Sequence, residues 1–302
     1  MSNKSGSLED DCLIKVAIIG YGSIAKVHSK ILNKLGARIV ALSCSTLETG
    51  EIAANEVYNL YGYKPYVSIN IGDIVNFSKP NCIFICTPPE QHFKDIIKAL
   101  DYEIPIFCEK PLIWNNKFTK DDIRNNLELI KYFKHRKLFC NFANNNLLIS
   151  LIKKAQIDNE VKSFKFIFYT QGSYQNREIA VDLLPHGIAM LTYLLGFNGK
   201  INNYIEKSGS FKFQCNFQFN NTEVEFEFAQ SKTYVKKFQI QLNERLFERK
   251  IKQENGIYQV WFEEKDTNNT YKMKNPFEVE ISKFLRFVKE NLLNEEEDNF
   301  MK

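Results

Sequence analysis

The stretch that decides the fold covers residues 15–28 and reads KVAIIGYGSIAKVH. Residues 16–19 form an uninterrupted apolar run of the kind found in a strand that is buried on both faces. The pattern G-x-G-x-x-A follows at Gly20, Gly22 and Ala25 and leads into apolar residues that recur at helical spacing. The stretch therefore predicts a strand, a tight glycine turn and a helix.

This unit has the residues that a dinucleotide-binding turn needs. Gly20 permits the tight turn, Gly22 lets the backbone approach a pyrophosphate, and Ala25 keeps the helix close to the sheet. The phosphates would meet free N–H groups at the helix N-terminus, where the helix dipole favours negative charge. We predict that a dinucleotide is held by Gly20, Gly22, Ser23, Ile24 and Ala25. The alternative is a glycine-containing turn that binds nothing.

Length and composition predict a soluble globular protein. The 302 residues can form one large domain or two ordinary ones, and 44% hydrophobic and 25% charged residues are usual for that class. A net charge of +4 without a dense Lys/Arg block argues against a nucleic-acid partner. No apolar run approaches the roughly 20 residues of a membrane span. The seven cysteines lack a C-x-x-C pair, which predicts a reducing compartment and no zinc site. We therefore expect a cytoplasmic protein without a membrane or nucleic-acid partner.

The order of the segments predicts two domains of the α/β class. Residues 1–11 are expected to form a disordered tail without the apolar stretch of a signal peptide. Strands that alternate with helices over residues 12–143 predict an N-terminal Rossmann domain with a doubly wound parallel sheet. Residues 144–302 are expected to form a C-terminal α+β domain with a large, mostly antiparallel open sheet. In the first domain we expect strands at 16–19, 38–44, 82–86, 104–108 and 138–142, a short segment near Tyr66, and helices at 49–61, 73–77, 92–100 and 119–135.

The second domain is recognised by the strict alternation of apolar and polar side chains in residues 211–219. This period of two predicts an antiparallel strand with one buried and one wet face. Asn220 and Asn221 can supply the positive φ angles of a tight hairpin turn, after which the alternation continues to residue 228. We expect further strands at 161–170, 234–242, 246–251 and 257–262, helices at 188–195 and 276–293, and then an acidic tail.

Ligands of an open parallel sheet bind beyond the carboxyl ends of its strands. In this chain four segments that follow apolar strands are polar or expose their backbone, so we expect them to outline one crevice. They are residues 20–25, 44–46, 87–92 and 109–111.

Lys110 is the residue of this crevice with the clearest chemical use. An ammonium group that faces a nicotinamide could hydrogen-bond a substrate hydroxyl and stabilise alkoxide charge. Glu109 and Pro111 flank it, and proline fixes the backbone that aims the side chain. The alternative is a solvated surface lysine, which is what most lysines are.

A second constellation lies in the sequence DLLPH, where Asp182 and His186 are four residues apart. If the first helical turn is already formed there, the two side chains share one face. An imidazole can move a hydroxyl proton near neutral pH, and a carboxylate one turn away could orient it. The alternative is an N-capping Asp182, Pro185 in the first turn and an ordinary, partly buried His186.

Four motifs together resemble those of the Gfo/Idh/MocA oxidoreductase family. They are GYGSIA at 20–25, TPPEQH at 87–92, CEKPL at 108–112 and DLLPH at 182–186, in a similar order and spacing. The resemblance covers most of the chain, and its most specific elements are the E-K-P after a strand and the later D-x-x-x-H. It implies an NAD(P)-dependent dehydrogenase of a sugar, a cyclitol or a related compound.

The resemblance also implies roles for individual residues. Lys110 and His186 would occupy the catalytic positions, and Asp182 would be their partner and a substrate contact. The nicotinamide side would be lined by Thr87, Pro88 and His92, and Glu109 and Lys110 complete the expected cofactor-binding set.

Two departures from the family pattern fall on substrate contacts. Family members usually carry an acid three residues after the histidine, where this chain has Ala189. After the strand at 138–142, where an arginine often helps to hold a substrate, this chain reads ANNN. Both changes concern which substrate is bound rather than the transfer of a hydride.

The end of the second strand bears on the choice of cofactor. NAD-binding domains commonly place Asp or Glu there to hold the ribose 2′-hydroxyl. Here Cys44, Ser45 and Thr46 follow Ser43, with no acid before Glu48. Small hydroxyl side chains can donate to a 2′-phosphate without repelling it, which slightly favours NADP over NAD.

We therefore predict an NAD(P)-dependent oxidoreductase that transfers a hydride between nicotinamide and a secondary alcohol or ketone of a sugar, cyclitol or sugar-nucleotide-like substrate. One alternative is a catalytically idle, cofactor-bound regulatory protein on the same scaffold. Another, a methyltransferase with S-adenosylmethionine on the glycine turn, is disfavoured by the E-K-P segment and the antiparallel second domain. The resemblance implies a homodimer or homotetramer through the outer face of the second sheet, which would be a polar interface because it carries Lys212, Gln214, Asn216 and Gln218.

Overall fold

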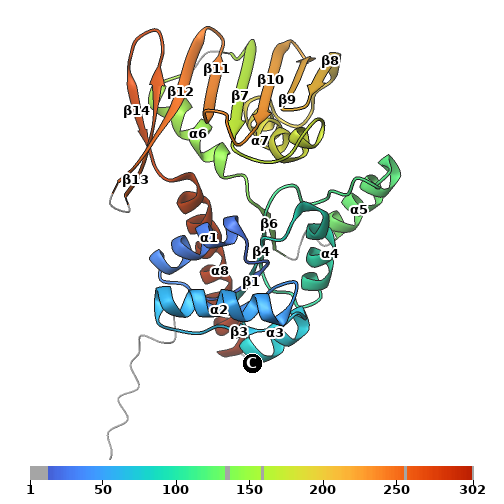
Figure 1. Ribbon diagram of the computed structural model, residues 1–302, viewed down its shortest axis with the longest axis vertical. Coiled ribbons are helices and arrows are strands. Elements are labelled where there is room, and N and C mark those ends of the chain that lie inside the picture. Colours follow the sequence, from blue (N-terminus) through green and yellow to red (C-terminus); the bar gives the residue numbers. More distant parts are fainter. Residues whose placement is uncertain (1–12, 133–136, 158–159, 255–256, 301–302) are drawn as a thin grey trace, which may run out of the picture. The chain divides into compact units, whose positions relative to one another are not determined.

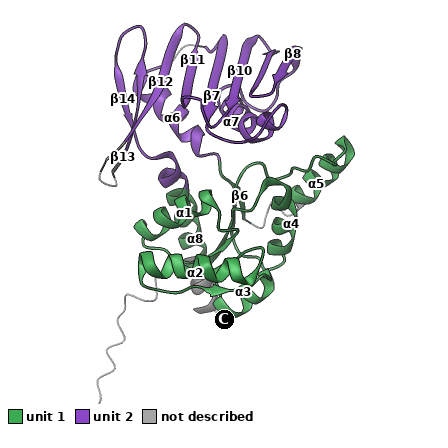
Figure 2. Cartoon of the chain, in the orientation of Figure 1, with its two compact units in different colours: residues 1–141, 281–302 green, residues 142–280 purple. Residues whose placement is uncertain are grey.

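The computed structural model describes residues 13–132, 137–157, 160–254 and 257–300. The tail expected at 1–11 and the last residues of the helix expected at 119–135 lie outside these ranges. The chain divides into two compact units (Figure 2). Unit 1 consists of Met1–Asn141 and Ile281–Lys302, and unit 2 consists of Phe142–Glu280.

Unit 1 contains a six-stranded sheet in the order β3-β2-β1-β4-β5-β6, in which all paired strands are parallel. The strand order reverses between β1 and β4, which is the place where open α/β sheets bind ligands. The predicted doubly wound parallel sheet is confirmed. Its strands are β1 (Lys15–Ile19), β2 (Arg38–Ser43), β3 (Tyr66–Val67), β4 (Cys82–Ile85), β5 (Ile106–Cys108) and β6 (Leu138–Cys140).

The helices of unit 1 lie between these strands in the sequence. The apolar run that opened the sequence analysis forms the middle of the sheet, because β1 pairs with both β2 and β4 and residues 16–18 are fully buried. The helices are α1 (Ser23–Lys34), α2 (Leu47–Tyr61), α3 (Ile71–Ser78), α4 (Pro89–Leu100) and α5 (Lys120–Tyr132).

The C-terminal helix α8 (Pro276–Phe300) differs from the prediction. We expected all of residues 144–302 in the second domain, but the chain from Ile281 onward groups with unit 1. The physical reason is Phe284, which is 1% exposed and packs on aromatic rings of the parallel sheet. Its ring centre lies 5.2–5.5 Å from those of Phe84, Phe107 and Phe139. The helix also continues past residue 293, so the segment expected as a tail is helical up to residue 300.

Unit 2 contains an eight-stranded sheet in the order β14-β13-β12-β11-β7-β10-β9-β8. The pair β7 and β10 is parallel and the other described pairs are antiparallel, which confirms the predicted large, mostly antiparallel sheet. Asn220 has a φ of 55° in the turn between β9 and β10, as expected for the hairpin. The strands are β7 (Ser163–Thr170), β8 (Ile201–Gly209), β9 (Lys212–Phe219), β10 (Thr222–Gln230), β11 (Lys237–Leu242), β12 (Arg245–Glu254), β13 (Ile257–Glu264) and β14 (Thr270–Met273).

Two helices, α6 (Ala143–Ala155) and α7 (Glu178–Leu195), pack on one face of this sheet (Figure 1). Alternate strand residues, mostly phenylalanine, form the core with leucines and a methionine of the helices. The sequence analysis did not identify α6, β8 or β14, and it placed the start of α7 ten residues too late, at 188. Pro185 obscured the first half of α7, although a proline can sit within a helix that tertiary packing stabilises.

Helix α7 is also long and apolar enough, by length and composition, to cross a membrane, which the sequence analysis did not recognise. This is weak evidence, because the core helix of a globular domain passes the same test. In unit 2 the helix buries Ile179, Leu183, Met190 and Leu191 in the core beneath the sheet.

Candidate functional site

The glycine turn after β1 is held against the end of β4. Gly20 has a φ of 81°, and its N–H donates to the carbonyl of Ser43 at 2.7 Å. A Cβ atom at Gly20 would lie 2.8 Å from the backbone nitrogen of Thr87. Side chains are strained at this φ, and the backbone of Thr87 leaves no room for one. The fold itself therefore requires glycine at position 20.

Gly22 is a different case. Its φ of −86° and ψ of −165° suit any residue, and no atom lies within 4 Å of the place where a Cβ would be. Among the described residues no side chain caps α1, and the first turn of this helix carries no acid. Its first N–H groups are therefore available to an anion. Next to Gly22, Ser23 is exposed, Ile24 is partly exposed and Ala25 is buried.

The three residues after β2 differ in how their side chains are engaged. Cys44 is partly exposed, and burial raises the pKa of its thiol. Ser45 is exposed. Thr46 caps α2, because its Oγ1 accepts from the backbone N–H of Thr49 at 3.1 Å while the Thr49 hydroxyl accepts from the N–H of Thr46 at 3.3 Å. This reciprocal capping box gives Thr46 a structural role that the sequence analysis missed.

His92 joins the loop after β4 to the loop after β5. Its ring is 1% exposed, with Nδ1 at 2.7 Å from the carbonyl oxygen of Pro111 and Nε2 at 2.7 Å from that of Thr87. Both partners are acceptors, so only a ring with protons on both nitrogens makes both hydrogen bonds. The Thr87 hydroxyl in turn donates to Asp95 at 2.8 Å. His92 therefore positions the two loops, and its contact with a nicotinamide stays a prediction. Pro88, which precedes α4, is exposed.

Glu109 is likewise turned inward, 8% exposed, and not toward the edge of the sheet as expected of a cofactor contact. Its Oε1 lies 2.6 Å from Nε2 of His28 and accepts from Nδ2 of Asn141 at 2.6 Å. Burial opposes ionisation of Glu109, but the hydrogen bonds of His28 and Asn141 and the charge of Lys110 outweigh it and lower the pKa. The sequence analysis missed His28 and Asn141, which carry no motif and become partners only through the fold.

Lys110 follows Glu109 at the carboxyl end of β5 and is partly exposed. Its peptide bond to Pro111 is cis. The contacts of Gly20, Thr87 and His92 place the four predicted segments together at one edge of the unit 1 sheet. This is the arrangement that the sequence predicted.

In unit 2, Asp182 and His186 both lie within α7, one helical turn apart. The helix begins at Glu178, so the alternative reading of Asp182 as an N-cap is wrong. Asp182 Oδ2 accepts a hydrogen bond from Nε2 of Gln230, a fully buried residue whose Oε1 accepts from the N–H of Tyr174 at 3.0 Å. Gln230 thus fixes the carboxylate, and the sequence analysis did not identify it.

The two departures from the family pattern have structural roles in unit 2. The carbonyl of Ala189 accepts from Nδ2 of Asn145 at 3.2 Å, which joins α6 to α7. Asn146 donates to Glu280 at 2.7 Å. These asparagines therefore anchor the start of α6 rather than repeat the charge of an arginine.

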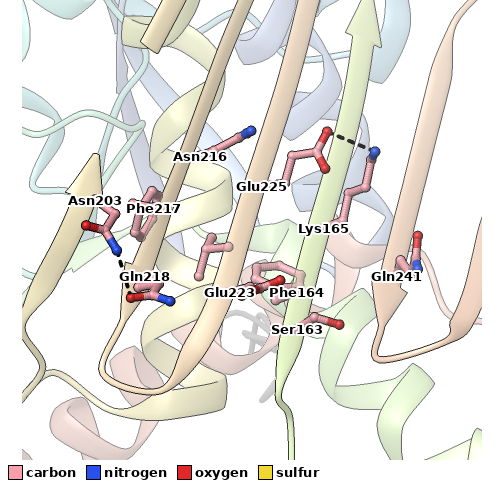
Figure 3. Close-up of a pocket in the computed structure, with 11 residues that line it drawn as sticks. Ser163, Phe164, Lys165, Asn203, Asn216, Phe217, Gln218, Glu223, Glu225 and Gln241 are labelled. Atoms are coloured by element: carbon pink, nitrogen blue, oxygen red, sulfur yellow. Dashed lines mark hydrogen bonds and ion pairs between the residues drawn. The ribbon is translucent and has the colours of Figure 1, made fainter. Parts of the chain in front are cut away.

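The outer face of the unit 2 sheet carries a shallow hollow of about 330 Å³ (Figure 3). Its polar side chains pair with each other, as in the Lys165–Glu225 ion pair at 2.8 Å and the hydrogen bond from Asn203 to Gln218 at 3.0 Å. Asp182 and His186 belong to the helix that packs on the opposite face. We assign no chemistry to this hollow, because its oppositely charged residues Lys165 and Glu225 pair with each other within the sheet.

Residues 14–136 match the family described as "Oxidoreductase family, NAD-binding Rossmann fold", Gfo/Idh/MocA. Residues 14–136 therefore carry the NAD-binding Rossmann domain of the Gfo/Idh/MocA oxidoreductase family. The match covers the glycine turn and the strand ends of unit 1, and it supports a nicotinamide cofactor over S-adenosylmethionine.

Known proteins extend this comparison. The chain is 27% identical over 101 residues to an inositol 2-dehydrogenase from Ralstonia nicotianae, which covers 33% of this chain and 29% of that protein. The chain thus spans less than a third of the curated relatives that it matches. Over 92% of its length and 90% of the other's, its fold is similar to that of a UDP-N-acetylglucosamine 3-dehydrogenase from Acidithiobacillus ferrooxidans, with a TM-score of 0.68 and 11% identity. A myo-inositol 2-dehydrogenase from Lactobacillus plantarum covers 91% of this chain and 89% of its own, with a TM-score of 0.66 and 14% identity.

The buried Glu109 network makes the stability of unit 1 depend on pH. We expect Glu109→Gln to lower the free energy of unfolding at pH 7 by about 3 kcal/mol, because breaking a buried pair leaves its partner uncompensated. Since folding lowers the pKa of Glu109, its contribution is complete above the pKa of the unfolded chain and is lost as the pH falls through the folded value. The difference between variant and wild type in urea unfolding should therefore shrink below about pH 4.

Glu56→Gln is the matched control, because Glu56 forms an exposed ion pair with Lys26. Exposed pairs contribute about 0–1 kcal/mol, so this variant should unfold nearly as the wild type does. Equal losses in the two variants, or a loss in Glu109→Gln that does not change with pH, would contradict the role of the buried network.

Proposed function

We propose that this chain is an NAD(P)-dependent dehydrogenase or reductase that acts on a secondary alcohol or ketone of a sugar or cyclitol. The observation that carries the proposal is the contrast between two glycines. The fold requires Gly20, whereas Gly22 meets open space at the start of α1. A pyrophosphate needs that close approach to the backbone and those N–H groups. The family match and the relatives named as inositol and UDP-sugar dehydrogenases support the same conclusion.

The chemistry that we assign to the chain's own residues is proton transfer and stabilisation of charge. A bound nicotinamide would supply or take up the hydride. His186 accepts the proton of a substrate hydroxyl, or returns it to a ketone, and Lys110 donates a hydrogen bond to the same oxygen and stabilises its developing negative charge. Asp182, which Gln230 holds in place, orients His186.

For the cofactor we propose a slight preference for NADP. Residues 44–47, which lie between β2 and Glu48, include no acid that would repel a 2′-phosphate, and Ser45 is exposed there. Thr46 supports this less than the sequence suggested, because its hydroxyl caps α2. Ser45 is therefore the hydroxyl to which we assign the 2′-phosphate contact.

A catalytically idle, cofactor-binding regulatory protein is the second candidate. Ala189 in place of the family's acid favours it, since no carboxylate follows His186 at that position. The trio Lys110, Asp182 and His186 favours an enzyme, because a binding protein has no need of all three. Sustained turnover with any cyclitol or sugar decides between the two.

We further propose a cytoplasmic location and a homodimer or homotetramer formed through the outer face of the unit 2 sheet. Cross-strand ion pairs such as Lys165–Glu225 and Lys212–Glu227 make that face polar. An interface there would be sensitive to ionic strength. Sedimentation at low and high salt should show the assembly dissociating as salt rises, and a monomer under both conditions would contradict it.

The two glycines should respond differently to alanine. Gly22→Ala should leave the free energy of unfolding within about 0.5 kcal/mol of wild type, since the new methyl group meets no protein atom. The same variant should bind NADPH and NADH at least tenfold more weakly, as measured by calorimetry. Gly20→Ala should instead destabilise the protein, because of its φ and the contact with Thr87. Unchanged cofactor binding by Gly22→Ala would remove the main support for the proposal.

The proposed roles of Lys110 and His186 are tested by turnover. We expect Lys110→Ala and His186→Ala to lower kcat for myo-inositol, or for another sugar or cyclitol that the wild type uses, by about 10²–10⁴-fold. Affinity for NADPH should change little in either variant. Phe197→Ala is the control, because Phe197 is 86% exposed. Full activity in both active-site variants would contradict the assigned roles.

A further inference from the structure

An arginine occupies a position in unit 2 where the sheet is otherwise aromatic. On the face that packs against α6 and α7, neighbouring strand residues form a row that crosses six strands. The row runs Phe228, Phe168, Phe238, Arg249, Phe262 and Tyr271. Arg249 pairs with Phe262 in the ladder, and its guanidinium carbon lies 4.0 Å from the centre of the Phe238 ring. The hydrophobic pattern alone would place an apolar side chain there.

The charge of Arg249 is poorly compensated. Among the residues that the structure describes, no carboxylate forms an ion pair with it, and its contacts are the rings of Phe238 and, at 5.7 Å, Phe168. Burial lowers the pKa of its guanidinium to about 10, with Tyr258 acting in the opposite direction. Contact with aromatic rings offsets part of the free energy that it costs to remove the guanidinium from water. A charge that is removed from water normally has a charged partner as well. As a whole residue Arg249 is nevertheless partly exposed.

Arg245, four residues earlier on the same strand, shows the usual arrangement. Its guanidinium also lies near a ring, 5.2 Å from the centre of Phe247, but it is paired with Glu264 at 2.6 Å and donates to the carbonyl of Ala155 at 3.0 Å. The same residue type on the same strand therefore has an internal anion at position 245. At position 249 the described part of the chain supplies none.

The ring of Phe168 connects Arg249 to the proposed catalytic histidine. The ring centre of His186 and the guanidinium carbon of Arg249 each lie 5.7 Å from the centre of Phe168. The two groups are therefore separated by no more than twice that distance, which is a span that a sugar with an anionic substituent can cover. The contact at 4.0 Å with the Phe238 ring holds the guanidinium, whose paired N–H groups can meet two oxygens of one anion.

We propose that Arg249 binds an anionic group of the substrate, so that this chain acts on a sugar or cyclitol that carries a carboxylate or a phosphate. This inference rests on the proposed function in one respect: it takes the anionic ligand of Arg249 to be the substrate of the proposed enzyme. A carboxylate and a phosphate share the chemistry that Arg249 recognises, and the experiment separates them.

The test compares matched neutral and anionic probes on the full chain. D-glucose is paired with D-glucuronate, and myo-inositol with myo-inositol 1-phosphate, in calorimetric titrations of wild type, Arg249→Met and Arg249→Lys in the presence of NADPH. In wild type we expect the anionic member of at least one pair to bind more tightly, and the pair that does so identifies carboxylate or phosphate. Arg249→Met should weaken that binding roughly ten- to hundredfold and leave the neutral probe within twofold. Arg249→Lys should fall in between, because an ammonium keeps the charge but not the planar fork.

The melting temperature separates a binding role from a packing role. Methionine suits an aromatic row, and an unpaired charge is costly there, so Arg249→Met should melt no lower than wild type. Arg245→Met is the matched control: it leaves Glu264 without its arginine and should lower the melting temperature without changing the affinity for either anionic probe. An Arg249→Met variant that melts lower and loses neutral and anionic probes alike would mean that Arg249 is structural, and the inference would be wrong.

Failure of the proposed function would look different. If no probe is oxidised or reduced but the preference for the anionic member disappears in Arg249→Met, Arg249 is an anion site of a binding protein. If turnover occurs and the ratio of kcat/KM for anionic and neutral substrates is the same in wild type and Arg249→Met, the proposed function is supported. The proposed role of Arg249 in binding an anion is then wrong. Wild type that binds both members of each pair equally, or binds neither, also contradicts the inference.

Discussion

The close approach of Gly20 to the backbone of Thr87 is the contact on which the proposed cofactor site depends. It lets the turn after β1 lie directly against the end of β4, where the strand order of the parallel sheet reverses. The N–H of Gly20 also donates a hydrogen bond to the carbonyl of Ser43 at the end of β2. Gly20 therefore contacts the ends of β1, β2 and β4. With Gly20 in place, α1 starts with its first N–H groups uncapped by the described side chains, and Gly22 has nothing in front of it. Gly20 is thus required by the fold of the turn, whereas Gly22 remains open to a ligand.

The charged side chains with little exposure fall into two kinds: those that stabilise the fold and those that we assign to function. Glu109 is surrounded by His28 and Asn141, and Asp182 is held by Gln230, so that each carboxylate has an internal donor. Arg249 has aromatic rings but no anion among the described residues. A protein can keep a buried charge without a counter-ion where its function uses that charge. The protein is then less stable than it would be with an apolar residue at that position. This contrast is why Arg249 is assigned to the substrate and Glu109 to the fold.

The sequence predicted those parts of the molecule in which local pattern and tertiary role agree. The apolar run at 16–19 and the glycines after it specified β1 and its turn, and the alternation at 211–219 specified β9. Helix α6 was missed because three asparagines begin it, although Leu147, Leu148 and Leu151 recur at helical spacing. The roles of His28, Asn141 and Gln230 could not be read from the chain, because their partners lie 81, 32 and 48 residues away. His92 was found as a motif residue, but only the structure shows its ring nitrogens on two backbone carbonyls.

The central claim is that the edge of the unit 1 sheet holds a nicotinamide dinucleotide. A calorimetric titration of the purified, cofactor-free protein with NADPH, NADH, NADP and NAD tests it most directly. The account predicts saturable binding with one site per chain, tighter for the phosphorylated cofactors because residues 44–47, between β2 and Glu48, include no acid that would oppose a 2′-phosphate. Preference for NADH would keep the site and overturn the assignment of Ser45. If none of the four binds, the open space in front of Gly22 does not hold a nicotinamide dinucleotide, and the account of the site is wrong.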